Sequence, residues 1–564
     1  MPTLHWVGKD KVKHHHRDVP YRVLLDDHHY QAPAGTPGNS TDNRIIQGDN
    51  LEALKSLLPE FEGKVQCIYI DPPYNTGNEG WVYNDNVNDP RIKKWLGQVV
   101  GKEGEDMSRH DKWLCMMYPR LKLLHRLLKD DGVILISIDR NELASLKTIM
   151  DEIFLASNWV GEICWRNVTD NNPTNISLEH EYVICYAKKK SSIEAIWKSA
   201  ELASKQALID LGEQIVSRHG SAKGMQEEYS AWYKEHKHEI WPFQDYKFID
   251  SGGIYTGSRS VHNPGKEGYR YEAPNDVIHP RTGKPCKQPL MGYRFPWETM
   301  QSLLEQDRII FGKDESKLVE LKLYVSDYKS KFSSVIELDG RTGTNEIKAI
   351  FPENNRPFDY PKPSELIFDF LSFSSKPDAV ILDSFAGSGT TAHAVLKLNA
   401  QDGGNRRFIL IEMMDYADSL TAERVRRVMS GYGEGDKAVA GLGGAFTFQR
   451  LGEPLFDSQQ QLNPAVGLPA IRSYIAWLEC IPRQELASLD NPRHRYWLGE
   501  ANGQRVFFCY EPERITCLDM DLLNELIQTP GPTLFYADQL ALGEELMRRH
   551  NLRFKKIPRD ITRI

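Results

Sequence analysis

Four consecutive residues, Asp71-Pro72-Pro73-Tyr74, combine a carboxylate, a stiff backbone and an aromatic ring. Two successive prolines hold the backbone extended, and Asp71 is a pure hydrogen-bond acceptor at neutral pH. A carboxylate and a fixed backbone carbonyl could together accept both N–H bonds of an aromatic amine. The residue types therefore indicate chemistry at the exocyclic amino group of a nucleobase, with Tyr74 as a stacking partner.

Methyl transfer is the reaction that this segment suits. The adenine amino group is a weak nucleophile because its lone pair is delocalised into the ring. Acceptors that take both N–H bonds draw the nitrogen towards tetrahedral geometry and free the lone pair for attack. The base must leave the DNA stack to reach such a site. The other interpretation is an ordinary turn with a rigid Pro-Pro corner, and the apolar strand that precedes Asp71 favours catalysis.

A second segment combines glycines with hydroxyls over Asp383-Ser384-Phe385-Ala386-Gly387-Ser388-Gly389-Thr390-Thr391. Gly387 and Gly389 allow a tight turn and close approach of a ligand. The N–H groups at a helix start attract a carboxylate, such as the methionine end of S-adenosylmethionine. The threonines add hydroxyl partners, and Glu412, after the next strand, could accept both ribose hydroxyls.

A generic nucleotide loop is the alternative for this second segment. It departs from the dinucleotide pattern G-x-G-x-x-G, because Ala392 stands at the third glycine. The turn alone is weak evidence, and its pairing with residues 71–74 makes S-adenosylmethionine the expected cofactor. No metal site is expected.

Apolar runs that alternate with helical patterns must position both segments. We expect strands at 65–70, 133–138, 163–165, 182–187, 380–382 and 408–411, and helices at 112–128, 142–154, 364–373 and 391–398. This alternation predicts a doubly wound α/β sheet, which binds ligands at the carboxyl ends of its strands. The two segments, though far apart along the chain, should therefore lie side by side.

The alternation is interrupted between residues 191 and 345. We therefore predict an α/β domain in two halves, residues 44–190 and 346–450, around an α+β insert at 191–345. Residues 451–564 form a small C-terminal domain in this scheme. Residues 1–43 are polar and rich in His, Pro and Gly, and a surface arm is expected there.

The motifs resemble those of β-class DNA amino-methyltransferases, in which D-P-P-Y precedes F-x-G-x-G and a target-recognition region lies between them. Within that class the chain is most similar to modification (Mod) subunits of Type III restriction–modification systems, on residues 71–77, 179–183, 360–363 and 366–367. The resemblance implies a Rossmann-like class I S-adenosylmethionine methyltransferase sheet with permuted motif order and adenine-N6 as the target.

The resemblance also implies roles for single residues. It places Asp49 beside the cofactor adenine, and Lys362 and Ser364 over the methionine end. For Asp49 a helix N-cap is an equal alternative. The resemblance further implies a homodimer, double-stranded DNA with a flipped base as substrate, and a restriction (nuclease–helicase) subunit as a partner.

The insert supplies the expected DNA-reading surface. Basic and aromatic residues alternate there, as in grooves that contact phosphates and bases. The candidates are Tyr255, Arg259, Lys266, Arg270, Tyr293, Arg294 and Trp297. Composition alone fits a small β-rich domain with a mixed surface equally well, and the position of the insert favours recognition.

The composition fits a cytoplasmic protein without a membrane span. No apolar run is long enough to cross a bilayer, and the eight cysteines lack the spacing of disulfides or zinc ligands. The net charge of −8 does not favour DNA binding, although a local basic surface can coexist with it. Two rival functions stay open: cytosine-N4 methylation, where Ser commonly replaces the residue at Asp71, and a specificity subunit that mainly docks a nuclease-helicase.

Overall fold

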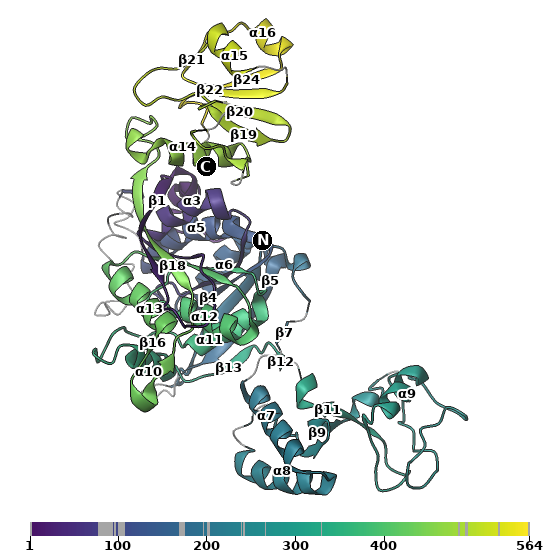
Figure 1. Ribbon diagram of the computed structural model, residues 1–564. Helices are drawn as coiled ribbons and strands as arrows, with labels where there is room; N and C mark the ends of the chain where they lie inside the picture. Colours follow the sequence, from purple (N-terminus) through teal and green to yellow (C-terminus); the bar gives the residue numbers. More distant parts are fainter. Residues whose placement is uncertain are drawn as a thin grey trace. The chain divides into compact units, whose positions relative to one another are not determined.

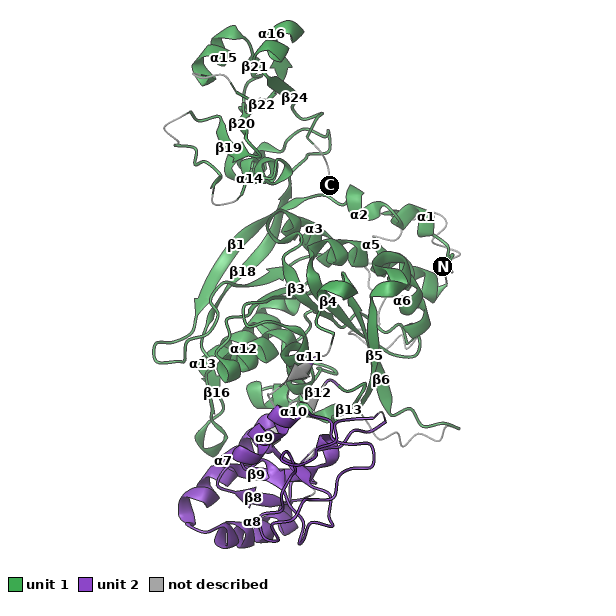
Figure 2. Cartoon of the chain, turned by 90° about the vertical axis from the view of Figure 1, so that its right-hand side faces the viewer, with its two compact units in different colours: residues 1–195, 333–564 green, residues 196–332 purple. Residues whose placement is uncertain are grey.

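The computed structural model describes residues 3–76, 94, 98–99, 108–167, 175–195, 197–199, 203–237, 240, 243–265, 267–328, 330–482, 485–490, 494–527 and 531–561. The chain divides into two compact units, one of residues 1–195 with 333–564 and the other of residues 196–332 (Figure 2). Each unit is described by itself.

A ten-stranded sheet is the framework of the first unit, in the order β1-β18-β2-β15-β14-β3-β4-β6-β5-β13 (Figure 1). Its strands are β1 (Arg22–Gln31), β2 (Asn43–Gln47), β3 (Val65–Ile70), β4 (Leu128–Ile138), β5 (Trp159–Arg166), β6 (His180–Ala187), β13 (Val335–Glu337), β14 (Val380–Asp383), β15 (Arg407–Glu412) and β18 (Ala445–Pro454). The neighbours from β18 to β4 are parallel, whereas β6 runs antiparallel to β4 and β5. The predicted α/β sheet is thus confirmed.

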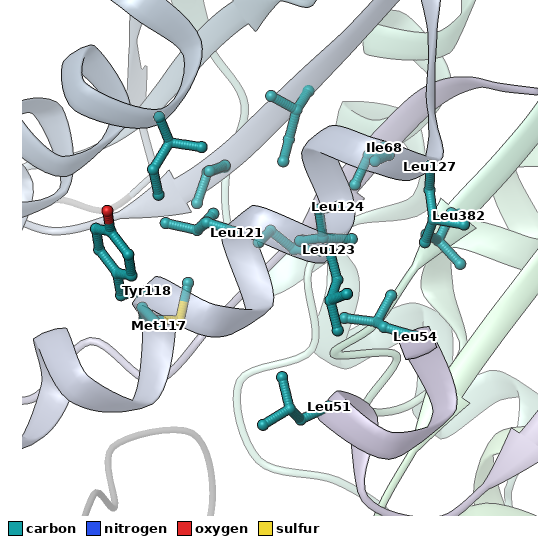
Figure 3. Close-up of a cluster of buried hydrophobic side chains, with 14 of the residues drawn as sticks. Leu51, Leu54, Ile68, Met117, Tyr118, Leu121, Leu123, Leu124, Leu127 and Leu382 are labelled. Atoms are coloured by element: carbon teal, nitrogen blue, oxygen red, sulfur yellow. The ribbon is translucent and has the colours of Figure 1, made fainter. Parts of the chain in front are cut away.

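Helices cover both faces of the central strands, which explains their continuous apolar runs. Ile68 of β3 packs with leucines of α3 (Asn50–Phe61) and α5 (Arg109–Leu127), as Figure 3 shows. Tyr69 points to the other face, where its ring lies 5.9 Å from that of Phe370 in α11 (Ser364–Ser374). Fully burying a Leu or Ile side chain contributes about 1.5–3 kcal/mol to the stability of the fold. Packing on both faces therefore holds β3 in place, and with it Asp71, the residue that follows the strand.

Local capping sets where α5 begins. Ser108 accepts a hydrogen bond from the backbone of Asp111, whose side chain accepts one from the backbone of Ser108. This capping box starts the helix at Arg109, before the expected start at Lys112. The remaining helices of the α/β part are α6 (Leu143–Met150), α10 (Arg341–Ile350), α12 (Thr390–Asp402) and α13 (Glu423–Ser430).

The expected N-terminal surface arm was wrong. Helices α1 (Lys9–Val12) and α2 (His15–Asp18) bury Val12 and His16, and β1 is the edge strand that pairs with β18. An edge strand with one face in water tolerates polar residues, so polar composition misled the prediction.

The second unit has an α+β composition. Helices α7 (Ala203–Arg218), α8 (Ala222–His236) and α9 (Trp297–Glu305) accompany an antiparallel sheet in the order β10-β11-β9-β8. Its strands are β8 (Phe248–Asp250), β9 (Gly253–Ser258), β10 (Ile309–Ile310) and β11 (Glu320–Tyr324), and a separate pair joins β7 (Lys198–Ser199) to β12 (Ser330–Lys331). The unit ends before the expected boundary at 345, because β13 and α10 belong to the first unit.

Beyond β18 the chain builds a smaller sheet, β19 (Trp497–Ala501), β20 (Gln504–Phe508), β22 (Thr533–Ala537) and β24 (Leu552–Lys556), with cores of its own. Helices α14 (Leu468–Leu478), α15 (Met520–Leu526) and α16 (Glu544–Arg549) accompany it. Short pairs join β16 (Gly431–Tyr432) to β17 (Val439–Ala440) and β21 (Cys517–Leu518) to β23 (Gln539–Leu540). Across the described ranges, none of the helices has the length and apolar character to cross a membrane.

Candidate active site

The two segments singled out in the sequence leave the sheet from adjacent parallel strands. In the register of β14 and β3, Ile381 pairs with Cys67 and Leu382 with Ile68. The carboxyl ends of both strands therefore lie at the same edge of the sheet. The charge of Asp71 is one of the groups that raise the pKa of Asp383, which reflects this closeness. The structure thus brings the two segments together.

Asp71 is a buried carboxylate with an unusual set of neighbours. Within the described part of the chain, its Oδ1 accepts no hydrogen bond, and the ammonium of Lys362 lies 3.4 Å away. Burial raises the pKa of Asp71, Lys362 opposes this rise, and the balance remains above the ordinary value. The segment that follows Asp71 is held by α5, because Nε1 of Trp113 donates to the carbonyl of Pro73 at 2.6 Å.

Tyr74 lies in the same cluster. Its hydroxyl donates to Oε2 of Glu181 at 2.8 Å and accepts from Nζ of Lys362 at 2.7 Å. The lysine also lies 4.7 Å from the centroid of the Tyr74 ring. Burial and the two nearby carboxylates of Asp71 and Glu181 raise the pKa of Tyr74, so its hydroxyl stays protonated.

The backbone turns sharply after Tyr74. Asn75 has φ 58°, in the left-handed region that Asn tolerates better than most residues. Its amide donates to the buried carboxylate of Glu142 at 2.5 Å and to the carbonyl of Arg109 at 3.1 Å. These bonds tie Asn75 to the start of α5 and to Glu142, the residue that precedes α6. Sequence reasoning assigned no role to Glu142, because nothing in the pattern shows its burial.

The glycine-rich turn is held by backbone bonds. Gly387 and Gly389 have φ 51° and 81°, both left-handed. The N–H of Gly387 donates to Oε2 of Glu412 at 2.8 Å, while Oε1 of Glu412 accepts from the N–H of Met414 at 3.0 Å. The N–H of Ala386 donates to the carbonyl of Ile411 in β15 at 3.1 Å. Glu412 therefore supports the turn, besides any role towards a ligand.

Asp383 is an internal support of the same turn. Its carboxylate accepts from the hydroxyl of Thr391 at 2.5 Å and from the N–H of Phe385 at 3.0 Å. Burial raises the pKa of Asp383 to about 7. The ring of Phe385 packs against the main core. The residue that precedes α12, Gly389, supplies no side-chain cap to that helix.

A buried charge cluster lies against the turn and was not foreseen. The guanidinium of Arg424, fully buried, donates to Ser388 Oγ at 2.9 Å, to Thr390 Oγ1 at 2.8 Å and to Glu346 at 2.9 Å. Glu346 also accepts from the hydroxyl of Ser364 at 2.5 Å. Ser388, Thr390 and Ser364, all expected near the cofactor, are thus held by one ion pair, which no local sequence pattern signals.

Asp49 caps α3, as one of its two interpretations required. Its Oδ1 accepts from the N–H groups of Leu51 and Glu52 at 2.9 and 3.2 Å. The amide of Asn50 donates to the carbonyl of Ser384 at 3.0 Å, and the N–H of Gly48 donates to the carbonyl of Glu412 at 3.0 Å. Residues 48–50 therefore lie beside the glycine-rich turn.

The predicted DNA-contacting residues of the insert fall into different environments. Arg259, Arg270 and Arg294 are exposed, whereas Tyr255 and Trp297 are half-buried. Tyr293 has no exposed surface and stacks on Tyr271 with centroids 4.6 Å apart, so its predicted contact with DNA was wrong. Lys266 lies outside the described residues.

The parallel sheet and the two segments at its carboxyl edge define a Rossmann-like fold of the methyltransferase class. Residues 65–423 match the model of the DNA methylase family, and the chain belongs to this family.

Curated relatives agree with this assignment. The chain is 45% identical over 443 residues to the Mod subunit of the Type III enzyme EcoP15I of Escherichia coli. The aligned residues cover 76% of this chain and 66% of that subunit. Identity to the StyLTI Mod subunit of Salmonella typhimurium is 32% over 425 residues, or 72% of this chain and 57% of the relative. The Type II methyltransferase M.KpnI of Klebsiella pneumoniae is 31% identical over 399 residues, with shares of 67% and 82%. The chain thus spans less than two thirds of the length of the two Mod subunits.

Proposed function

We propose that the chain is a site-specific DNA methyltransferase that moves the methyl group of S-adenosylmethionine to N6 of adenine in duplex DNA. The observation that carries this proposal is the buried Asp71, whose Oδ1 accepts no hydrogen bond from the described residues, beside Tyr74 and next to the glycine-rich turn. Membership of the DNA methylase family supports it.

The residues around the turn fit S-adenosylmethionine. A Cβ at Gly389 would come within 3.1 Å of the Thr421 carbonyl, so this tight turn favours glycine at that position. The hydroxyl oxygen of Ser384 is buried and has no partner among the residues that the structure describes. The start of α12 would hold the methionine carboxylate, and Glu412 the ribose. When bound, the cofactor supplies an electrophilic methyl group on a sulfonium.

The chain's own groups would then prepare the amine. Asp71 accepts an N–H bond of the extruded base, which shifts electron density to the nitrogen. The Tyr74 ring stacks on the base, and its bond to Glu181 fixes the ring orientation. A nucleophilic cysteine is not required, and burial raises the pKa of the nearby Cys67 thiol to about 12.

We also propose the partners. The Mod relatives support a modification and recognition role beside a restriction (nuclease–helicase) subunit, with the insert as the DNA-reading part. A homodimer with one flipped base per active site completes the proposal. The enzyme would work in the cytoplasm, where its eight free cysteines stay reduced.

Expression in a bacterium without DNA methyltransferases tests this function. Nucleosides from the total DNA would contain N6-methyladenine with the wild-type chain and far less of it with Asp71→Asn. N4-methylcytosine in its place would establish the rival target base. Unmodified DNA from cells that hold folded wild-type protein with S-adenosylmethionine bound would contradict the proposal.

A further inference from the structure

Lys362 and Glu181 form a charged pair directly against the proposed reacting groups. Nζ of Lys362 lies 2.9 Å from Oε2 of Glu181, 2.7 Å from the hydroxyl of Tyr74 and 3.4 Å from Oδ1 of Asp71. Only 10% of the lysine side chain is exposed. A buried ammonium therefore sits among three oxygens of the site.

The ammonium lies beside the acceptor that a substrate amine would need, 3.4 Å from Oδ1 of Asp71. A lysine has three N–H donors. Two of them point to Tyr74 and Glu181, so the third is free to point towards Asp71. Nζ also lies 4.7 and 5.4 Å from the ring centroids of Tyr74 and Trp165. An adenine amine that donates to Oδ1 of Asp71 would compete with the lysine for the space beside this oxygen.

Glu181 is fixed well enough to keep the lysine when it leaves Asp71. It lies on β6, where it pairs with Trp165 of β5. Its Oε1 accepts from the amide of Asn167 at 2.7 Å, and its Oε2 accepts from Tyr74. Glu181 thus gives the ammonium a second carboxylate partner, held rigidly, besides Asp71.

The arrangement also answers an electrostatic need. A buried carboxylate without a counter-charge takes up a proton, and a protonated Asp71 would be a poor acceptor for an amine. Besides Lys362, the charged or titratable groups facing Asp71 are Glu181, Tyr74, Tyr69 and Asp383. Lys362 is the cation in this set.

We propose that Lys362 is a placeholder for the target amine: its ammonium keeps Asp71 ionised until the base arrives, and Glu181 then retains the displaced lysine. Both residues are positioning residues, because they act through Asp71 and Tyr74. The proposal rests on the proposed function and adds a step to it, the exchange of one N–H donor for another.

The dependence of kcat/KM for DNA on pH separates this role from a structural one, because it reports ionisations of the free enzyme. The substrate would be phage DNA from a methyltransferase-deficient host, with labelled S-adenosylmethionine. In Lys362→Met the acid limb should move up by roughly one to three pH units, because Asp71 loses its cation. In Glu181→Gln the limb should move down, because a neighbouring negative charge is lost, and the KM for DNA should rise as the lysine stays on Asp71.

Lys376→Met is the matched control, since Lys376 forms an exposed ion pair with Asp131. Its profile should coincide with that of the wild type, and calorimetry should give the same S-adenosylmethionine affinity for Lys376→Met and the wild type. If Lys362→Met does not fold, Lys362→Arg keeps the charge and should leave the acid limb in place.

Three results would overturn the placeholder role: unchanged limbs in Lys362→Met and Glu181→Gln, shifts of both in the same direction, or a moved limb in Lys362→Arg. A wild-type enzyme that transfers no methyl group would instead contradict the proposed function itself.

Discussion

The backbone N–H of Gly387 meets the carboxylate of Glu412 at 2.8 Å, across the carboxyl ends of the parallel strands β14 and β15. This bond depends on the left-handed backbone of Gly387, φ 51°. A side chain at that conformation is strained and would intrude where a ligand approaches. Gly387→Asp should therefore weaken S-adenosylmethionine binding by roughly 10–100-fold or more in calorimetry.

Gly403→Asp is the control for this variant. Gly403 has φ 71° at the other end of α12, and a Cβ added there would meet no atom of the described residues within 4 Å. The same strain and charge there should lower stability and leave the affinity unchanged. Equal affinities in Gly387→Asp and wild type would refute the assigned role of the turn.

The ion pair of Glu346 and Arg424 should dominate stability near the turn. Glu346→Gln leaves a fully buried guanidinium without its carboxylate, which should cost about 3–5 kcal/mol in urea unfolding. Glu353→Gln removes an exposed partner of Arg427 and should cost under about 1 kcal/mol. Similar losses of stability in both variants would show that burial of the Glu346–Arg424 pair adds nothing to its contribution.

The contribution of Glu346 to the free energy of unfolding should disappear at acid pH. Burial alone would raise its pKa, but His393, Arg424 and Lys397 outweigh burial and lower the pKa to about 2. A depressed pKa stabilises the fold above the ordinary value near 4.5, and the contribution is lost as pH falls towards 2. The difference in unfolding free energy between wild type and Glu346→Gln should thus shrink over this range. A constant difference would contradict the assignment.

Asp383 should show the opposite dependence. Burial raises its pKa to about 7, so its carboxyl is protonated in the folded protein at pH 5. Because the folded pKa exceeds the unfolded one, wild-type stability falls as pH rises from about 4 to 7. Asp383→Asn lacks this loss, and its Tm relative to wild type should rise between pH 5 and pH 8. A Tm difference independent of pH would argue that Asp383 is ionised throughout.

The sequence allowed the sheet and both edge segments to be predicted because those features are local. Six consecutive buried residues in β3 and a glycine turn after β14 are visible as apolar runs with breaks. The contact of Lys362 with Tyr74 joins residues 288 positions apart, and its geometry follows from packing alone. Composition also cannot tell which face an aromatic ring takes, which is why Tyr293 was misplaced on the surface.

Exchange of residues 196–332 tests the recognition role of the insert. These residues form a compact unit by themselves, so a graft from another family member should leave the α/β core intact. The methylated sequence, mapped by detecting modified bases in cellular DNA, should change to that of the donor. An unchanged sequence would place recognition elsewhere in the chain.

The most direct test of the account is transfer of labelled methyl groups from S-adenosylmethionine to unmethylated DNA by purified wild-type protein and Asp71→Asn. The variant should bind S-adenosylmethionine as the wild type does and transfer methyl groups about 10²–10³-fold more slowly, because only the amine acceptor has changed. Transfer at the wild-type rate by Asp71→Asn would contradict the central claim that this carboxylate activates the target amine.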